Sequence, residues 1–341
     1  MFASVVTLTL ICTSCNSIKN TVTIVPNASK NKVDVLFDGK LFTSYIYPAD
    51  MEKPVLYPLH SAGGTVITRG FPLVPRPNER VDHPHHVGSW LNFMDVNGVD
   101  FWNNSYAIPA DKKPKYGSIR HREVISTKNG SKGILIVAAD WIDHNGKVLL
   151  KEETQFIFGG GADIRTIERT TKLTAQAETV TFTDNKDGLI AIRMDRAFEE
   201  PSDKADNFLD ANGISTEVKA MNNEGVNGVY RNSEGLEKGD VWGKPTQWVS
   251  LSAEKAGEKI TVAIIDHKNN PGYPAHSHAR GYGLFSTNNF GSQVFDENAP
   301  LFKLVLNSGE STVLKHKIII KSGSFATDAE INRITKEFNK P

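Results

Sequence analysis

Apolar residues fall in short runs along this 341-residue chain. The runs are rich in β-branched and aromatic residues and are bounded by Gly, Asn, Asp or Pro, a pattern typical of strands joined by turns. The clearest runs are Val33–Phe37, Ile134–Ile142, Val148–Phe158 and Ile260–Asp266. Residues 143–146 end in Asn-Gly, which favours a tight hairpin. The pattern predicts an all-β protein, with a further hairpin from Phe302–Leu306 to Val313–Ile320.

Two segments lack this regular alternation of strand-like runs and turns. Pro48–Pro77 is rich in Pro and Gly, so we expect loops and short strands there. Ala197–Gly243 is polar and has little periodicity, which predicts a long loop over the edge of a sandwich or a lid. Sandwiches of this length often form one unit, so residues 31–341 are expected to make a single β-sandwich domain.

The C-terminal end has the pattern of a helix. Thr327 is followed three residues later by Glu330, which together form a capping box. Ile331, Ile334 and Phe338 then fall on one stripe. We expect this helix to pack on the outside of a sheet.

The N-terminal end differs from the rest of the chain. The apolar run Val5–Cys12 is followed by two small residues and Cys15, which resembles a secretion signal with a lipobox-like end. No Lys or Arg precedes the run, and Cys12 stands where a lipobox usually has Leu. We predict a signal peptide at 1–15, lipidation at Cys15 and a linker at 16–30. The protein would then be exported, either periplasmic or a membrane-anchored lipoprotein. The alternative is a poorly packed N-terminal strand.

Composition excludes several classes of chemistry. Lys and Arg number 39, as do Asp and Glu, so the formal net charge is zero and no basic face for nucleic acid is expected. Both cysteines, Cys12 and Cys15, lie in the signal-like segment. The rest of the chain therefore lacks thiols for catalysis, zinc–thiolate sites or iron–sulfur clusters.

The densest group of reactive side chains is Asp82-His83-Pro84-His85-His86. Imidazole suits acid–base work near neutral pH, which makes His83 and His86 candidate catalytic residues and Asp82 and His85 candidate binding residues. Imidazole also suits transition metals, so a metal at His83, His85 and His86 is a less favoured alternative. We predict no cofactor, because no second ligand set of known spacing appears. The remaining alternative is a polar loop with structural histidines.

Two other segments carry similar groups. His267 precedes a Pro-containing loop, and His278 and Arg280 follow it. An arginine offers a planar fork for a carboxylate or a pair of hydroxyls. Asp187 lies at a bend and Arg193 ends the apolar strand that follows. The alternative interpretation of the first segment is a hairpin loop with exposed histidines. The alternative for the second is a turn aspartate and a surface arginine.

Tryptophans and one phenylalanine lie near these segments or beside the long polar region. They are Trp90, Phe101, Trp102, Trp242 and Trp248. Sugar faces stack on such rings, and on this basis Trp90 and Trp102 are candidate ligand contacts. The alternative is that they are core residues.

The order of these motifs resembles an uncharacterised bacterial family that carries the label "methane oxygenase PmoA". The motifs are Tyr57-Pro58-Leu59, Asp82-His83-Pro84-His85-His86, Val96-Asn97-Gly98-Val99-Asp100-Phe101-Trp102, Asp187-Gly188, Arg193, His267, Pro274, His278-Ala279-Arg280-Gly281-Tyr282-Gly283-Leu284 and Asn288-Asn289-Phe290-Gly291. Asn289 replaces a proline of the family pattern, and Ser277 or His276 replaces an aromatic residue. The label does not suit this chain, because it lacks the long apolar stretches of a membrane oxygenase.

The family is similar in fold to galactose-mutarotase-like proteins, which are large antiparallel β-sandwiches that bind sugars. The resemblance implies an acid–base pair of histidine and carboxylate with an arginine nearby. His83 or His86 would act with His278, and Asp187 would be a second base or an orienting group. Arg193 would help to hold the substrate.

Two hypotheses follow. The first is an exported carbohydrate-active enzyme of hydrolase, lyase or epimerase type, with a carbohydrate or glycoside as its small-molecule partner. The second is a non-catalytic sugar-binding lipoprotein at the cell surface.

Overall fold

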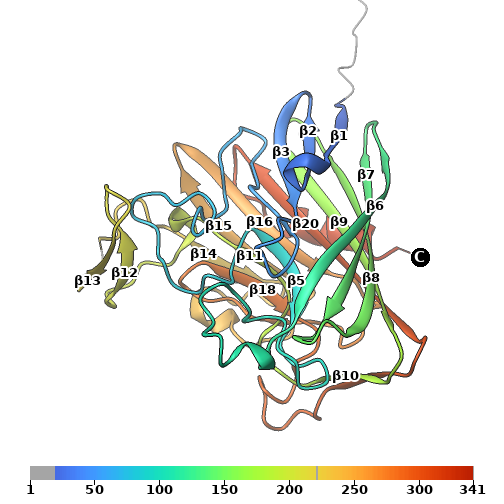
Figure 1. Cartoon of the computed structure of the whole chain (residues 1–341). Coiled ribbons are helices and arrows are strands. Elements are labelled where there is room, and N and C mark those ends of the chain that lie inside the picture. The colour runs from blue at the N-terminus through green and yellow to red at the C-terminus, as the bar shows by residue number, and fades with distance from the viewer. Residues whose placement is uncertain (1–19, 220–221, 341) are drawn as a thin grey trace, which may run out of the picture.

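The computed structural model describes residues 20–219 and 222–340. Two eight-stranded antiparallel sheets face each other (Figure 1). The first contains, in spatial order, β1 (Val22–Asn27), β2 (Lys32–Phe37), β3 (Lys40–Ile46), β4 (Val55–Leu56), β5 (Ser89–Phe93), β11 (Gly188–Arg193), β18 (Leu284–Asn288) and β17 (His276–Ser277). The second contains β14 (Val229–Asn232), β15 (Trp248–Lys255), β16 (Glu258–Asp266), β20 (Ser311–Ser322), β9 (Ile164–Ala175), β8 (Val148–Gly160), β7 (Gly133–Ile142) and β6 (Ser118–Lys128).

The main core lies between these sheets. Alternate residues of β2, starting at Val33, are buried, and so are residues of β16 such as Val262 and Ile264. They join one apolar cluster with Ile190 and Ile192 of β11. Burial of alternating β-branched side chains from two sheets is the main force that holds a sandwich together. The predicted all-β antiparallel sandwich is confirmed.

The helix α1 (Asp328–Phe338) packs on the outer face of the second sheet. Thr327 and Glu330 form the predicted capping box, and Ile331 is buried against Trp248 and Ile319. The indole of Trp248 also donates a hydrogen bond to Asn332 at 2.7 Å. The predicted C-terminal helix and its packing are confirmed.

The segment 16–30 is not a linker over its whole length. Residues Val22–Asn27 form β1, which pairs with β2, and Ala28–Lys30 form a 3-10 helix, η1. Val22 and Ile24 are buried in the core, so this stretch gains apolar contacts that a linker would not make. The predicted signal peptide and Cys15 lie outside the described residues. Among the described residues, no helix has the length and apolar character needed to cross a membrane.

Two further expectations about the chain differ from the structure. The segment β19 (Lys303–Leu306) pairs with β10 (Val180–Thr183) rather than with β20, so no terminal hairpin forms. β20 is instead a central strand between β9 and β16, where its alternating apolar residues are buried on the core side. The region 197–243 contains the hairpin β12 (Asp206–Leu209) and β13 (Ser215–Val218), seen at the left of Figure 1, together with β14.

Short 3-10 helices complete the description: η2 (Lys113–Lys115), η3 (Arg196–Phe198) and η4 (Lys238–Val241).

Candidate functional site

Two strands that carry predicted site residues, β5 and β11, are neighbours in the first sheet, and β18 lies on the other side of β11. Ala191 of β11 pairs with Trp90 of β5, and Arg193 pairs with Leu284 of β18. Ala191, Trp90 and Leu284 belong to an apolar cluster distinct from the core between the sheets. Because side chains alternate along a strand, these residues point away from the main core. The candidate site therefore lies on the outer face of the first sheet, under the loops that connect its strands.

Buried Arg69 fixes the shape of the histidine loop. One of its terminal nitrogens donates to the backbone carbonyls of Arg80 and Asp82, at 3.2 and 2.9 Å. The other donates to the carbonyls of His83 and His86, both at 3.0 Å. His83 has a φ of +43°, a left-handed conformation that a non-glycine residue seldom adopts. The four carbonyl contacts explain how the loop is held in this conformation.

The carboxylate of Asp82 is the centre of an ionic network. Its Oδ1 accepts from Arg193 at 2.6 Å and from Arg69 at 2.7 Å, and its Oδ2 accepts from Nδ1 of His83 at 2.6 Å. Burial by itself would raise the pKa of Asp82. The charge of Arg193, the hydrogen bond from His83 and the charge of Arg69 outweigh burial and hold that pKa well below its usual range. Asp82 is therefore a permanent anion at physiological pH.

His83 is the accessible member of this network. Its side chain is 42% exposed. An ionised carboxylate only accepts hydrogen bonds, so Nδ1 of His83 must carry the proton that it shares with Asp82. Neutral His83 thus presents the lone pair of Nε2. The ring is stacked on Tyr282 at 5.1 Å and on His86 at 4.8 Å, with both interplanar angles below 5°.

Of the other two histidines of the loop, His86 is buried and His85 is half-buried, and both are neutral. Burial first, and then the neighbouring His85, lower the pKa of His86 well below its usual value. Its Nδ1 accepts a hydrogen bond from Arg193 at 3.3 Å. Burial and the charge of Lys53 lower the pKa of His85 to about 2. Of the three imidazoles, His83 alone combines exposure with a carboxylate partner.

Trp102 connects the histidine loop to the second predicted segment. Its ring lies 5.9 Å from that of His86 and 6.1 Å from that of His278. His278 Nε2 lies 3.9 Å from Oδ1 of Asp187, whose two oxygens both accept from Lys186 at 2.7 Å. Burial lowers the pKa of His278 to about 4 despite the opposing charge of Asp187. His278 is therefore neutral at physiological pH, and its contact with Asp187 is not a salt bridge there.

Arg280 is the unpaired cation of the site. Its guanidinium lies 4.7 Å from the ring centre of Trp242. Across residues 20–219 and 222–340, no carboxylate or carbonyl accepts from its side chain, which is half-buried. Trp242 packs against Phe295, on which His276 is stacked at 5.2 Å. A guanidinium held on an aromatic face keeps its hydrogen-bond donors available for a ligand.

Unsatisfied polar atoms gather around these residues. Buried nitrogens without a hydrogen-bond partner occur in His85, His86, Trp90, Trp242, His276 and His278. Such atoms are uncommon in native proteins, because leaving a buried donor or acceptor unpaired costs roughly 1–3 kcal/mol. These six nitrogens have no partner among the protein atoms that the structure describes.

The structure brings most of the predicted residues together and separates one of them. His267 follows β16 of the second sheet and packs on Phe338 of α1, with ring centres 5.1 Å apart. Its Nδ1 accepts from the backbone of Asn269. His267 therefore lies by the second sheet, whereas the other predicted residues lie on the first, and its role in ligand binding stays a prediction.

Trp90 and Trp102 also differ from expectation. Both are fully buried, so neither offers a face to a ligand. Trp90 is stacked on His86 at 5.3 Å and forms the floor beneath the histidines.

Sequence reasoning did not single out Arg69, Tyr282 or Lys53 as site residues. Arg69 lies in a Pro- and Gly-rich loop segment that gives no signal of its contacts. Tyr282 lies in the His-Ala-Arg block, two residues after Arg280, which was the available clue.

The alternative of a metal at His83, His85 and His86 stays a prediction. Within the described parts of the chain, no group of three or more His, Cys, Asp or Glu side chains is gathered as metal ligands would be. His83 and His86 lie face to face, an arrangement that does not direct their nitrogens at one point.

Sequence comparison places the chain in a family. A family model, described as a family of unknown function (DUF6807), matches residues 32–336. The chain belongs to this DUF6807 family. No curated protein matches its sequence. The family description assigns no activity and makes no reference to a methane oxygenase.

Solved structures resemble this DUF6807 protein only loosely. The galactosidase domain of the α-galactosidase–sucrose kinase AgaSK shares 10% identity at a TM-score of 0.40, over 89% of this chain and 42% of that one. The Slr1438 protein from Synechocystis sp. PCC 6803 shares 10% identity at 0.32, over 89% and 96% of the two chains. A putative aldose 1-epimerase from Escherichia coli K12 shares 10% identity at 0.26, over 90% and 100%. Similarity at this level identifies neither ligand nor reaction.

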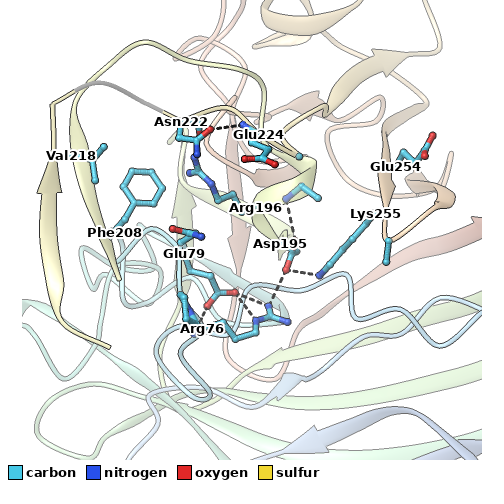
Figure 2. A pocket seen from close by; sticks show the side chains of 15 residues that line it. Arg76, Glu79, Asp195, Arg196, Phe208, Val218, Asn222, Glu224, Glu254 and Lys255 are labelled. Carbon is cyan, nitrogen blue, oxygen red and sulfur yellow. Dashed lines mark hydrogen bonds and ion pairs between the residues drawn. The ribbon is translucent and has the colours of Figure 1, made fainter. Parts of the chain in front are cut away.

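A separate cavity of about 490 Å³ lies at the base of the β12–β13 hairpin in this DUF6807 protein (Figure 2). Asp195 pairs there with Arg76 at 3.1 Å and with Lys255 at 2.6 Å, and Arg76 also pairs with Glu79. Because these charges already satisfy one another, they are less suited to capture a charged ligand than Arg280 is.

Proposed function

We propose that this protein is a carbohydrate-active enzyme that works by acid–base catalysis, with His83 as the residue that moves the proton. The single observation that carries the proposal is the pair formed by exposed His83 and half-buried, permanently ionised Asp82. A carboxylate behind a histidine fixes its tautomer and stabilises the imidazolium that forms when the ring accepts a proton.

The proton would move at Nε2 of His83. Nδ1 keeps its hydrogen bond to Asp82, while Nε2 takes a proton from a hydroxyl, a water or a ring carbon of the substrate. In a second step the imidazolium gives that proton to the leaving group or back to the same face of the substrate. Stacking of His83 between Tyr282 and His86 keeps the ring in one orientation throughout. Hydrolysis, elimination and epimerisation all use such a group.

Arg280, Asp187 and Lys186 are the groups we propose for substrate binding. Arg280 offers a planar fork to vicinal hydroxyls or a carboxylate, and Asp187 accepts hydrogen bonds. Tyr282 and Trp242 are both half-buried, so each presents part of a ring to the apolar face of a sugar.

The test is turnover of a panel of glycans, 3-keto-glycosides and uronides by the purified protein and two variants. His83→Asn removes the imidazole and retains a residue type that tolerates left-handed backbone. His267→Asn is the matched control, since it makes the same change outside the site. We expect turnover by the wild type and by His267→Asn, and its loss in His83→Asn.

A non-catalytic sugar-binding protein gives a different result. It would bind members of the panel without turnover, and the affinity would be the same in His83→Asn. That outcome would replace the enzyme proposal with the binding one.

We also propose that the protein is exported and lipidated at Cys15, on the strength of the signal-like order of residues 1–15. Bacterial cells expressing the full chain and its Cys15→Ser variant would be fed a palmitate analogue. Label in the wild type and none in the variant supports the proposal, and equal labelling contradicts it.

A further inference from the structure

Lys53 is a buried amine that lacks a carboxylate partner. It is 5% exposed, and its Nζ donates to the backbone carbonyl of His85 at 2.7 Å. Nζ also lies 5.3 Å from the ring centre of Trp90. Within residues 20–219 and 222–340, no acidic side chain forms a salt bridge with it. Lys255 of the cavity in Figure 2, by contrast, is paired with Asp195 at 2.6 Å.

The two carboxylates that act electrostatically on Lys53 are engaged elsewhere. They belong to Glu52 and Asp100. Glu52 accepts from Lys113, Ser118 and Arg120. Asp100 accepts from the backbone of Trp102 and from Asn103. Neither can easily move to neutralise an ammonium group at Lys53.

A cavity adjoins this amine. It has a volume of about 230 Å³, and Lys53 lines it together with Met51, Leu73, Pro84, His85 and Val87. Pockets for drug-sized ligands span roughly 300–1,000 Å³, so an occupant of this cavity would be smaller. The lining is mixed, because Asp50, Glu52, Asn104, Ser105 and Tyr106 add polar groups beside the amine and His85. The cavity lies on the Pro84–His85 side of the histidine loop and does not involve His83.

Burial makes this amine chemically unusual. It lowers the pKa of Lys53 to about 7, against the opposing charges of Glu52 and Asp100. A substantial fraction of the side chain is then the neutral amine at physiological pH, whereas an ordinary lysine has a pKa of about 10.4 and is almost wholly protonated. The neutral amine is the nucleophilic form.

We propose that Lys53 condenses with the carbonyl carbon of a small aldehyde or ketone bound in this cavity. This activity goes beyond the proposed His83 chemistry and does not depend on it. The nitrogen lone pair attacks the carbonyl carbon, and the carbonyl π electrons move to oxygen, which takes a proton to give a carbinolamine. The nitrogen then expels that oxygen as water and forms a C=N bond. One carbonyl and one amine give one imine and one water, with no oxidation or reduction.

The experiment uses benzaldehyde as the probe and sodium cyanoborohydride to reduce the imine to a stable amine. The wild-type chain is treated at pH 7, digested, and each lysine is quantified by mass spectrometry. We expect Lys53 to be modified at least tenfold faster than exposed Lys112, at a rate that saturates with benzaldehyde concentration. Modification of Lys53 no faster than Lys112, or a rate that rises linearly with concentration, overturns the proposal.

Two variants test whether the reaction at Lys53 requires the cavity. Leu73→Trp narrows the cavity and leaves Lys53 in place, so we expect the rate at Lys53 to fall at least fivefold. Leu301→Trp, at an exposed position away from the cavity, is the matched control and should not alter it. An unchanged rate in Leu73→Trp would show that the reaction does not require the cavity and would overturn the proposed site.

Discussion

The dipeptide Asp-His occurs three times in the sequence, and the fold treats two of these places, Asp82-His83 and Asp266-His267, differently. At Asp82-His83, the carboxylate is bound by two guanidinium groups and the imidazole is exposed. At Asp266-His267, the carboxylate is 1% exposed, and its imidazole neighbour in space is His316 of β20, at 3.7 Å. At the first place charged groups bind the carboxylate near the surface, and at the second its hydrogen-bond partners in the interior are uncharged.

The partners of each carboxylate explain the difference. Asp266 accepts from the amides of Asn270 and Asn289 and from the backbone of Ala275, none of which carries a charge. Burial therefore raises the pKa of Asp266 to about 6. Burial also lowers the pKa of His316 to about 3, so that pair holds no charge separation at mildly acidic pH. Asp82 stays ionised far into the acidic range and its histidine is exposed, whereas Asp266 takes up a proton near pH 6, which is why we place proton transfer at His83.

The largest expected effect is on catalysis. His83→Asn should reduce turnover by about 10²–10⁴-fold, the usual contribution of a general acid or base. Its free energy of unfolding should stay within about 0.5 kcal/mol of the wild type, because His83 is exposed. Steady-state kinetics with a substrate from the panel and denaturant unfolding measure the two quantities. Equal loss of turnover in His267→Asn would remove the contrast between the two places.

Removal of the charge of Asp82 should destabilise the fold. Asp82→Asn leaves the buried guanidinium groups of Arg69 and Arg193 without an anion, which we expect to cost about 3–5 kcal/mol in denaturant unfolding. Asp206→Asn is the control, since its partner Arg80 keeps Glu199. Because the folded pKa of Asp82 is depressed, its contribution is present above about pH 4 and is lost as the pH falls further. A cost equal to that of the control would show that the network is not needed for stability.

The carboxyl of Asp266 should show the opposite pH dependence. Its folded pKa of about 6 exceeds the unfolded value of about 3.9, so the folded state binds the proton more tightly. Stability from this group is therefore present in acid and falls by about 1.4 kcal/mol per pH unit between roughly pH 4 and pH 6. The free energy of unfolding of wild type minus that of Asp266→Asn, measured from pH 4 to pH 7, should decrease across this window. A difference in unfolding free energy that stays constant from pH 4 to pH 7 would contradict the raised pKa of Asp266.

The smallest expected effect concerns Tyr282, whose ring is stacked on that of His83. Tyr282→Leu removes the stacking on His83 and the contact with the guanidinium of Arg193, whose centre lies 4.8 Å from the ring. We expect a loss of about 0.5–1.5 kcal/mol in stability and a smaller fall in turnover than in His83→Asn. Tyr106→Leu, at an exposed loop position, is the control. A fall in turnover as large as that of His83→Asn would assign Tyr282 a role beyond packing and sugar binding.

Local sequence patterns predicted the fold well where they depend on contacts between residues that are close in the sequence. The alternation in Val33–Phe37 and the capping box at Thr327 depend on neighbours within a few residues, and both were confirmed. The terminal hairpin was wrong because β19 and β20 pair with β10 and β9, which lie more than a hundred residues earlier in the chain. The pattern of apolar residues in a strand specifies which of its faces is buried. It does not specify the strand with which it pairs.

The sequence by itself determined the class of the fold, the reactive residue types and the three segments in which they cluster. It could not distinguish Asp82-His83 from Asp266-His267, because the dipeptides have the same local chemistry. Tertiary structure made that distinction by bringing Arg69 and Arg193 to one carboxylate and uncharged amides to the other. Ionisation depends on the charges and the burial around a group, and both come from residues distant in the chain.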